Sequence, residues 1–176
     1  MDKKVEKENA EKFNKAAMVA GKVFSSKNGN VETKDLKEIA DEFGVKIEEL
    51  FAVAEYDYRV WQSVKKADKI IKDIADEFGV EWGDLVIGIE AHWYGLSENL
   101  IYDACGDKVW QAVHEVVYDA DISNSDWFDS SMSLEFDIDM DDLIRGLITH
   151  WYEAIELYDS PVKKSLQPFL KYDDEE

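Results

Sequence analysis

Two stretches of eighteen residues in this chain have nearly the same sequence, and this repeat restricts how the chain can fold. Residues 77–94 read EFGVEWGDLVIGIEAHWY and residues 135–152 read EFDIDMDDLIRGLITHWY, with eight identical positions. A shorter third copy begins at Glu42, so the three copies are offset by 35 and 58 residues. Unequal offsets argue against a regular solenoid. The repeat is therefore more typical of a recurring way of packing helices.

Each copy has the pattern of a helix end, a turn and the start of the next helix. Gly44 and Gly79 stand where a helix would end in a left-handed residue. Leu50 and Leu85 stand where the following helix would enter the core. Elsewhere apolar residues recur at spacings of three and four, and no stretch reads as a convincing strand. The sequence predicts an all-α fold, a compact array of about seven or eight helices with repeated αα-hairpin units.

The helices can be placed from their caps and periodicity. We expect one α-helical domain over residues 1–172, comprising a basic N-terminal helix (1–30), an acidic region with the repeats (33–160) and a short last helix (161–171), followed by an acidic tail (173–176). The apolar stripe that follows Gly44 is long enough to predict a break near Ser63–Lys66. Residues 119–134 lack a useful period and are predicted to form a loop. Ser97, Asp139 and Ser160–Pro161 are expected to begin helices.

The composition restricts the cellular compartment in which the protein is expected and the kinds of metal site it could form. The single Cys105 excludes a disulfide framework and any metal site built from cysteines. No apolar run approaches the roughly 18 residues that span a bilayer. The first residues, MDKKVEKENAEKF, lack the apolar centre of a signal peptide. We therefore expect a cytoplasmic protein that does not bind membranes.

The negative charge of the chain is concentrated in one block. Residues 73–162 carry twenty-two acidic groups against Lys108 and Arg145, whereas residues 1–37 carry nine lysines and six acids. The net charge of the whole chain is −20. Such a block repels nucleic acid and lipid headgroups and attracts cations or basic protein surfaces. No direct binding to nucleic acid is expected, and a solvated acidic surface is the simplest alternative to a binding role.

The segments IADEFGVKIEELF and IADEFGVEWGDLV resemble the helix-turn-helix pattern of DNA-binding domains over about twenty residues. That resemblance implies a DNA-reading second helix with polar and basic side chains. The second helices here read KIEELFAVAEYDYR and EWGDLVIGIEAHWY, which are acidic and apolar. The pattern thus predicts the shape of an αα-hairpin without its usual function.

The repeated histidines are the first candidates for chemistry. His92 and His150 share a helix face with Gly88 and Gly146, and each precedes a Trp-Tyr pair. Neither lies in a His-x-x-x-His or Glu-x-x-His pattern, so a structural role is preferred to a metal or acid–base site. Residues 119–130 superficially resemble a calcium loop, but Asn124 and Ser130 replace its sixth-position Gly and twelfth-position Glu. No cofactor, metal or enzymatic activity is predicted.

The acid run between Asp119 and Asp142 is the strongest candidate for function, with nine carboxylates and no basic residue. Alternate acids in an extended chain would lie ~6.6–7 Å apart on one face, close to the spacing of phosphates along one DNA strand, and acids on a helix can also form rows. Aromatic residues beside the charge, among them Trp151, would anchor a protein interface. The expected partner-binding residues are Asp119, Asp121, Asp126, Asp129, Glu135, Asp137, Asp139, Asp141, Asp142, Trp127 and Phe128.

In composition the chain resembles the DNA-mimic inhibitors of phages and mobile elements, the antirestriction and anti-CRISPR proteins. The resemblance implies an inhibitor in the bacterial host cytoplasm that occupies the basic nucleic-acid groove of a defence nuclease or CRISPR effector. One alternative is an immunity or antitoxin protein that caps a basic nuclease toxin. Another is a non-catalytic helical adaptor derived from a helix-turn-helix protein. Exposed aromatic side chains would also allow a homodimer.

Overall fold

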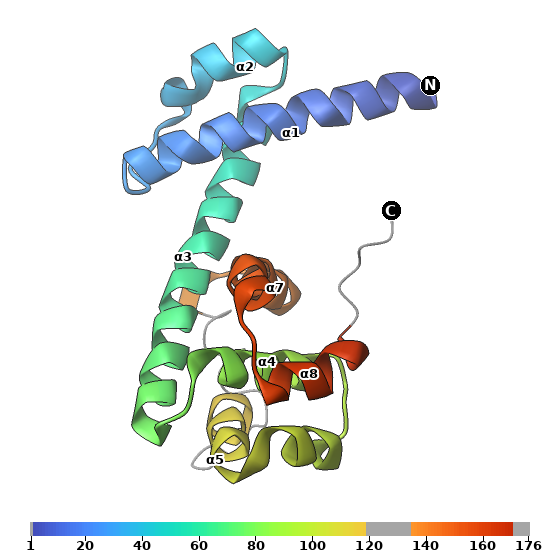
Figure 1. Ribbon diagram of the computed structural model, residues 1–176. Helices are drawn as coiled ribbons and strands as arrows, with labels where there is room; N and C mark the ends of the chain where they lie inside the picture. The colour runs from blue at the N-terminus through green and yellow to red at the C-terminus, as the bar shows by residue number, and fades with distance from the viewer. Residues whose placement is uncertain (1, 119–134, 171–176) are drawn as a thin grey trace. The chain divides into compact units, whose positions relative to one another are not determined.

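The structure is a computed structural model that describes residues 2–118 and 135–170. In this part of the chain it contains seven α-helices, two short 3₁₀ helices and no strand (Figure 1). The predicted all-α class is confirmed. The α-helices are α1 (Lys3–Ser26), α2 (Lys37–Phe43), α3 (Ile47–Phe78), α4 (Trp82–Trp93), α5 (Glu98–Tyr118), α7 (Met140–Leu157) and α8 (Pro161–Leu166), and the 3₁₀ helices are η1 (Thr33–Leu36) and η2 (Gln167–Phe169).

The chain divides into two compact units, residues 1–62 and residues 63–176, with the division falling inside α3. We call them the N-terminal unit and the C-terminal unit. Nothing in this division tests the prediction of a single domain over residues 1–172, which stays a prediction. The N-terminal unit has its own core, formed by side chains of α1, η1, α2 and the start of α3: Ala16, Ala20, Phe24, Leu36, Ala40, Leu50 and Ala54.

The C-terminal unit is organised around α4. Every residue from Leu85 to Ala91 is buried, because α4 contacts α5, α7 and α8 (Figure 1). Apart from Glu90, these seven residues are apolar or glycine, as expected for a helix in the middle of its unit. The neighbouring helices contribute one apolar face each, as with Leu143, Leu147 and Trp151 of α7.

The three sequence repeats have the same local structure. Gly44, Gly79 and Asp137 all take up left-handed backbone conformations, with φ of 66°, 64° and 51°. Eight residues into each copy stands a fully buried leucine whose amide donates to the carbonyl four residues earlier; the pairs are Leu50–Lys46 at 3.0 Å, Leu85–Glu81 at 3.2 Å and Leu143–Asp139 at 3.1 Å. The repeat is therefore a unit of helix-turn-helix packing.

Two helices differ from their predictions. The break expected near Ser63–Lys66 is absent, because α3 continues from Ile47 to Phe78. This prediction was wrong, since no Gly or Pro interrupts the backbone hydrogen bonding of those residues. Conversely, α5 is kinked at Gly106, whose φ of 77° and ψ of 176° are not helical.

The predicted caps of three helices are confirmed. The Ser97 hydroxyl accepts from the amide of Leu100 at 3.3 Å just before α5. Asp139 accepts from the amide of Asp141 at 2.8 Å at the start of α7. Ser160 accepts from the amide of Lys163 at 3.1 Å, and Pro161 occupies the first position of α8.

Candidate functional site

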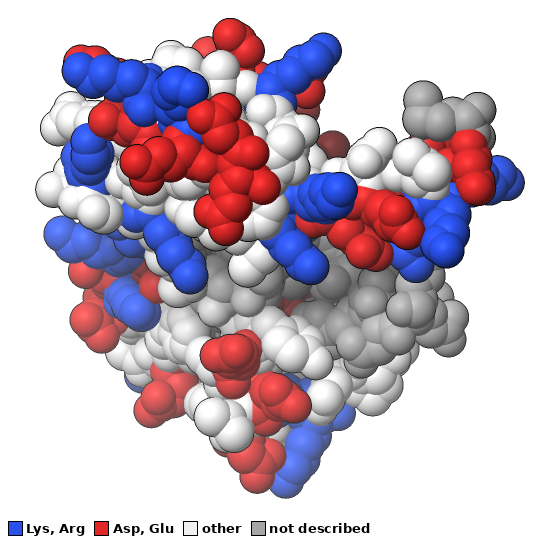
Figure 2. Space-filling model, turned by 90° about the horizontal axis from the view of Figure 1, so that it is seen from above, with Lys and Arg blue, Asp and Glu red and all other residues white. Residues whose placement is uncertain are grey.

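Most of the net negative charge of the chain lies in the C-terminal unit. Residues 63–176 contain twenty-seven acidic and nine basic residues, whereas residues 1–62 contain thirteen and eleven. On the face of the molecule drawn in Figure 2, Lys and Arg side chains stand among Asp and Glu side chains and do not form a separate region. The helices of the C-terminal unit are therefore the first candidates for a charged binding surface.

Five of the predicted partner-binding acids fall within the described residues, and they form a turn and the first turn of a helix. Asp137 has positive φ, Asp139 is the N-cap of α7, and Asp141 and Asp142 lie in the first turn of α7. The expected extended row of alternate acids is absent, because the backbone turns at Asp137 and becomes helical at Met140. Carboxylates at a helix N-terminus are stabilised by the helix dipole and the free amides there.

Two of these acids have basic partners inside the unit. Lys66 of α3 forms an ion pair with Glu135 at 2.5 Å, and its ammonium lies 5.9 Å from the centre of the Phe136 ring. Asp142 lies 3.6 Å from the guanidinium of Arg145, one turn along α7. Asp141 is exposed and has no such ion pair among the contacts of the described residues. The segment thus combines acids with a role in folding and acids that face solvent.

The other predicted contact residues lie outside the described part of the chain. They are Asp119, Asp121, Asp126, Asp129, Trp127 and Phe128. Trp151, which was expected to act as a surface anchor, is fully buried. That expectation was wrong, because Trp151 lies on the same face of α7 as Leu143 and Leu147 and packs into the core of the unit.

A second acidic surface lies on α5, where aromatic side chains separate the acids. The Tyr102 hydroxyl donates to Asp107 at 3.1 Å, and the Tyr118 hydroxyl donates to Glu98 at 3.1 Å. The hydrogen bond to Asp107 raises the pKa of Tyr102 above its usual value. Further along the helix, His114 contacts the rings of Trp110 and Tyr118, with centroids 6.1 Å and 4.9 Å apart. Sequence reasoning did not single out this surface.

Asp68 of α3 is a largely buried acid of this unit, with a side chain only 8% exposed. It accepts a hydrogen bond from the indole nitrogen of Trp151 at 2.9 Å and pairs with Lys72 at 3.0 Å. Nε2 of His150 lies 3.4 Å from its second oxygen. Burial raises the pKa of Asp68, but the hydrogen bonds from Trp151 and Lys72, with the charges of Lys72 and His150, lower that pKa below its usual 3.8.

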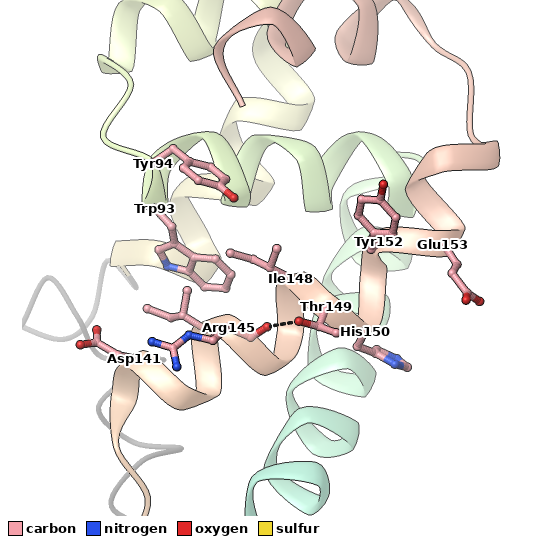
Figure 3. A pocket seen from close by; sticks show the side chains of 10 residues that line it. Trp93, Tyr94, Asp141, Arg145, Ile148, Thr149, His150, Tyr152 and Glu153 are labelled. Atoms are coloured by element: carbon pink, nitrogen blue, oxygen red, sulfur yellow. Dashed lines mark hydrogen bonds between the residues drawn. The ribbon is translucent and has the colours of Figure 1, made fainter. Parts of the chain in front are cut away.

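A hollow of about 740 Å³ runs along α7 beside the end of α4 (Figure 3). Its lining is aromatic and aliphatic in the middle and charged toward the ends; the residues are Trp93, Tyr94, Asp141, Ile144, Arg145, Ile148, Thr149, His150, Tyr152 and Glu153. The Thr149 hydroxyl donates to the carbonyl of Arg145 at 2.8 Å, the bond drawn dashed in Figure 3. The Tyr94 and Tyr152 side chains remain 38% and 39% exposed.

The repeated histidines have different surroundings. His92 packs edge-on against Tyr118, with ring centroids 5.3 Å apart, whereas His150 faces Asp68. The tryptophans that follow them meet, because the rings of Trp93 and Trp151 stack 6.0 Å apart with an interplanar angle of 5°. The repeated His-Trp-Tyr segments therefore bring α4 and α7 together through their tryptophans.

The Cys105 thiol and possible metal-binding clusters are two further places where a reactive site could lie. Burial and the nearby charge of Asp84 raise the pKa of Cys105 to about 12, so this thiol is protonated at neutral pH. Within residues 2–118 and 135–170, no three His, Cys, Asp or Glu side chains gather into a cluster that could hold a metal ion.

Asp68 and the hollow were missed from the sequence, although Asp68 left a signal there. Asp68 lies on the apolar stripe of α3, four residues after Val64 and three before Ile71, both of which are buried. A carboxylate in such a stripe must find buried donors. The hollow left no comparable signal, because it depends on where the end of α4 lies beside α7.

Comparison with known proteins supplies no family for this fold and site. No family model matches the chain, and no match was found among curated proteins or solved structures. None of the described helices is both long enough and apolar enough to cross a bilayer. Inference about function therefore depends on the charge and geometry described above.

Proposed function

We propose that the chain is an acidic inhibitor of the DNA-mimic type. In this proposal its C-terminal unit binds the basic nucleic-acid groove of a defence nuclease, a restriction enzyme or a CRISPR effector and keeps nucleic acid out. The observation that carries the proposal is the excess of twenty-seven acidic over nine basic residues in residues 63–176. Charge of this density attracts a cationic groove over several ångströms and speeds the encounter.

The way in which several acids are held supports the proposal. Asp139 is fixed by its bond to the amide of Asp141, Glu135 by Lys66, and Glu98 and Asp107 by tyrosine hydroxyls. Carboxylates whose positions are set before binding lose little conformational freedom when the partner arrives. A flexible acidic tail of equal charge would lose more.

The proposal can be tested with a variant in which the acids from residue 135 to 142 are neutralised. It carries Glu135→Gln, Asp137→Asn, Asp139→Asn, Asp141→Asn and Asp142→Asn. Asparagine tolerates positive φ and caps helices about as well as aspartate, so both the turn and the start of α7 are retained. We expect wild-type protein to restore plating of a phage that a restriction or CRISPR system blocks, and this variant to lose most of that effect.

A matched control removes the same number of charges from the N-terminal unit. Glu6, Glu8, Glu11, Glu38 and Glu42 are exposed, and changing all five to Gln gives the same net charge of −15. The control should act like wild type. In a gel-shift assay with the purified effector, wild type should displace bound DNA, and more weakly as NaCl rises. Equal loss of activity in both variants would contradict the proposal. So would displacement of DNA that does not change with NaCl concentration.

A further inference from the structure

The hollow along α7 has the form of a groove for a helix or an extended segment. Six of its α7 residues recur at three and four spacings and so lie on one side of that helix: Asp141, Ile144, Arg145, Ile148, Thr149 and Tyr152. From Asp141 to Glu153 the helix rises about 18 Å. Trp93 and Tyr94, at the end of α4, close one side (Figure 3). Grooves of this kind accept a row of apolar side chains from a partner.

The charges around the groove indicate which side chains a partner segment should carry. Asp141 lies at one end and Glu153 toward the other, with Ile148 between them (Figure 3). Among the described residues of the lining, Arg145 is the only Lys or Arg, and it lies 3.6 Å from Asp142. A partner segment therefore gains most from positive side chains at both ends and none opposite Arg145.

We propose that this groove binds a basic amphipathic segment of the partner protein. Two apolar side chains of that segment lie against Ile144, Ile148 and Tyr152, and Lys or Arg side chains lie near Asp141 and Glu153. The choice of a cationic partner rests on the proposed function, because it uses the charge of the C-terminal unit. The groove supplies the apolar contacts that slow dissociation, whereas the acids speed association.

The test uses a synthetic helical peptide of about 16 residues, long enough to span the groove. It carries leucines on one face and lysines near both ends, and a scrambled peptide of the same composition is the control. We expect the first peptide to shift the NMR signals of the Ile144 and Ile148 methyl groups, with the buried Ile155 as an internal reference. The scrambled peptide should bind at least about tenfold more weakly, because its apolar residues do not lie on one face.

Matched variants on the same helix separate the apolar from the charged contribution. Ile148→Ser and Tyr152→Ala should each weaken binding by about tenfold, whereas Leu157→Ser, at a site 89% exposed and outside the groove, should not. Glu153→Gln should weaken binding more than Glu156→Gln does. Arg145→Gln should strengthen it, because a like charge is removed.

The outcomes distinguish this inference from the proposed function. If the chain inhibits an effector in a salt-dependent way but Ile148→Ser and Tyr152→Ala inhibit equally well, the groove proposal is overturned and the function stands. If the peptide binds as expected but no effector is inhibited, the groove stands and the function fails. Equal binding of both peptides, or binding unaffected by the Ile148 and Tyr152 variants, overturns the groove proposal directly.

Discussion

Asp68 shows how a single residue can join distant parts of the C-terminal unit. It lies on α3, and its oxygens meet the indole of Trp151 and the imidazole of His150 from α7 as well as Lys72 of its own helix. A buried carboxylate without these donors would be strongly destabilising. The arrangement therefore fixes where α7 packs along α3 within that unit.

The lowered pKa of Asp68 makes its contribution to stability depend on pH. Because its folded-state pKa lies below 3.8, the charged form stabilises the fold above that pH, and this contribution is lost as pH falls through the folded-state value. We expect Asp68→Asn to reduce the free energy of unfolding at neutral pH, and the difference from wild type to shrink as pH falls below 3.8. Urea unfolding at several pH values measures this. A difference independent of pH would contradict it.

At the scale of the elements, close packing of α4 against α5 depends on Gly88. A Cβ atom built there would lie 2.5 Å from Cγ2 of Val113, whose side chain is stiff. Gly88→Ala should therefore destabilise the protein by about 1–3 kcal/mol. Gly21→Ala, in α1, is the control: its Cβ meets nothing within 4 Å, so it should stabilise by about 0.5–1 kcal/mol. Thermal unfolding of both variants checks the opposite signs.

The repeated turn gives a second prediction for the elements. Gly79 and Asp137 stand at the same position of their copies, and both have positive φ. Gly79→Ala should cost about 1 kcal/mol, since its Cβ meets no neighbour and only backbone strain is added. Asp137→Gly should stabilise by up to about 1 kcal/mol, because it relieves such strain. Chemical denaturation measures both changes, and destabilisation by Asp137→Gly would show that this carboxylate has a structural role beyond the turn.

The caps and turns of these helices were predictable from the sequence, whereas the contacts between helices were not. Helix termini can be predicted from the sequence because capping depends on residues only a few positions apart, as at Gly44, Gly79, Ser97 and Ser160. The prediction of Trp151 as a surface anchor was wrong, since periodicity identifies an apolar stripe but not the helix that covers it. The acids near Asp139 were predicted to form a binding site. That they form a turn followed by a capped helix could be predicted only by noticing that Asp137 occupies the turn position of the repeat.

For the whole molecule, the charge of the C-terminal unit should act in opposite ways on folding and on binding. Acids that repel one another within residues 63–176 lower the stability of the folded chain, whereas the same acids attract a basic partner. Salt screens both effects, since the Debye length falls from about 30 Å at 0.01 M to about 3 Å at 1 M. Raising NaCl should therefore raise the melting temperature and slow association with a cationic partner.

The salt dependence of the melting temperature and that of the association rate can be measured on the same variants. Together they test whether the acids lower stability and at the same time promote binding. The variant neutralised from Glu135 to Asp142 should show a weaker dependence of melting temperature on salt than wild type, and a weaker dependence of its association rate. The control neutralised in residues 1–62 should keep both dependences, because that unit has nearly balanced charge. If salt lowered the melting temperature of wild type, ion pairs such as Lys66–Glu135 would outweigh repulsion, and the acids would serve folding first.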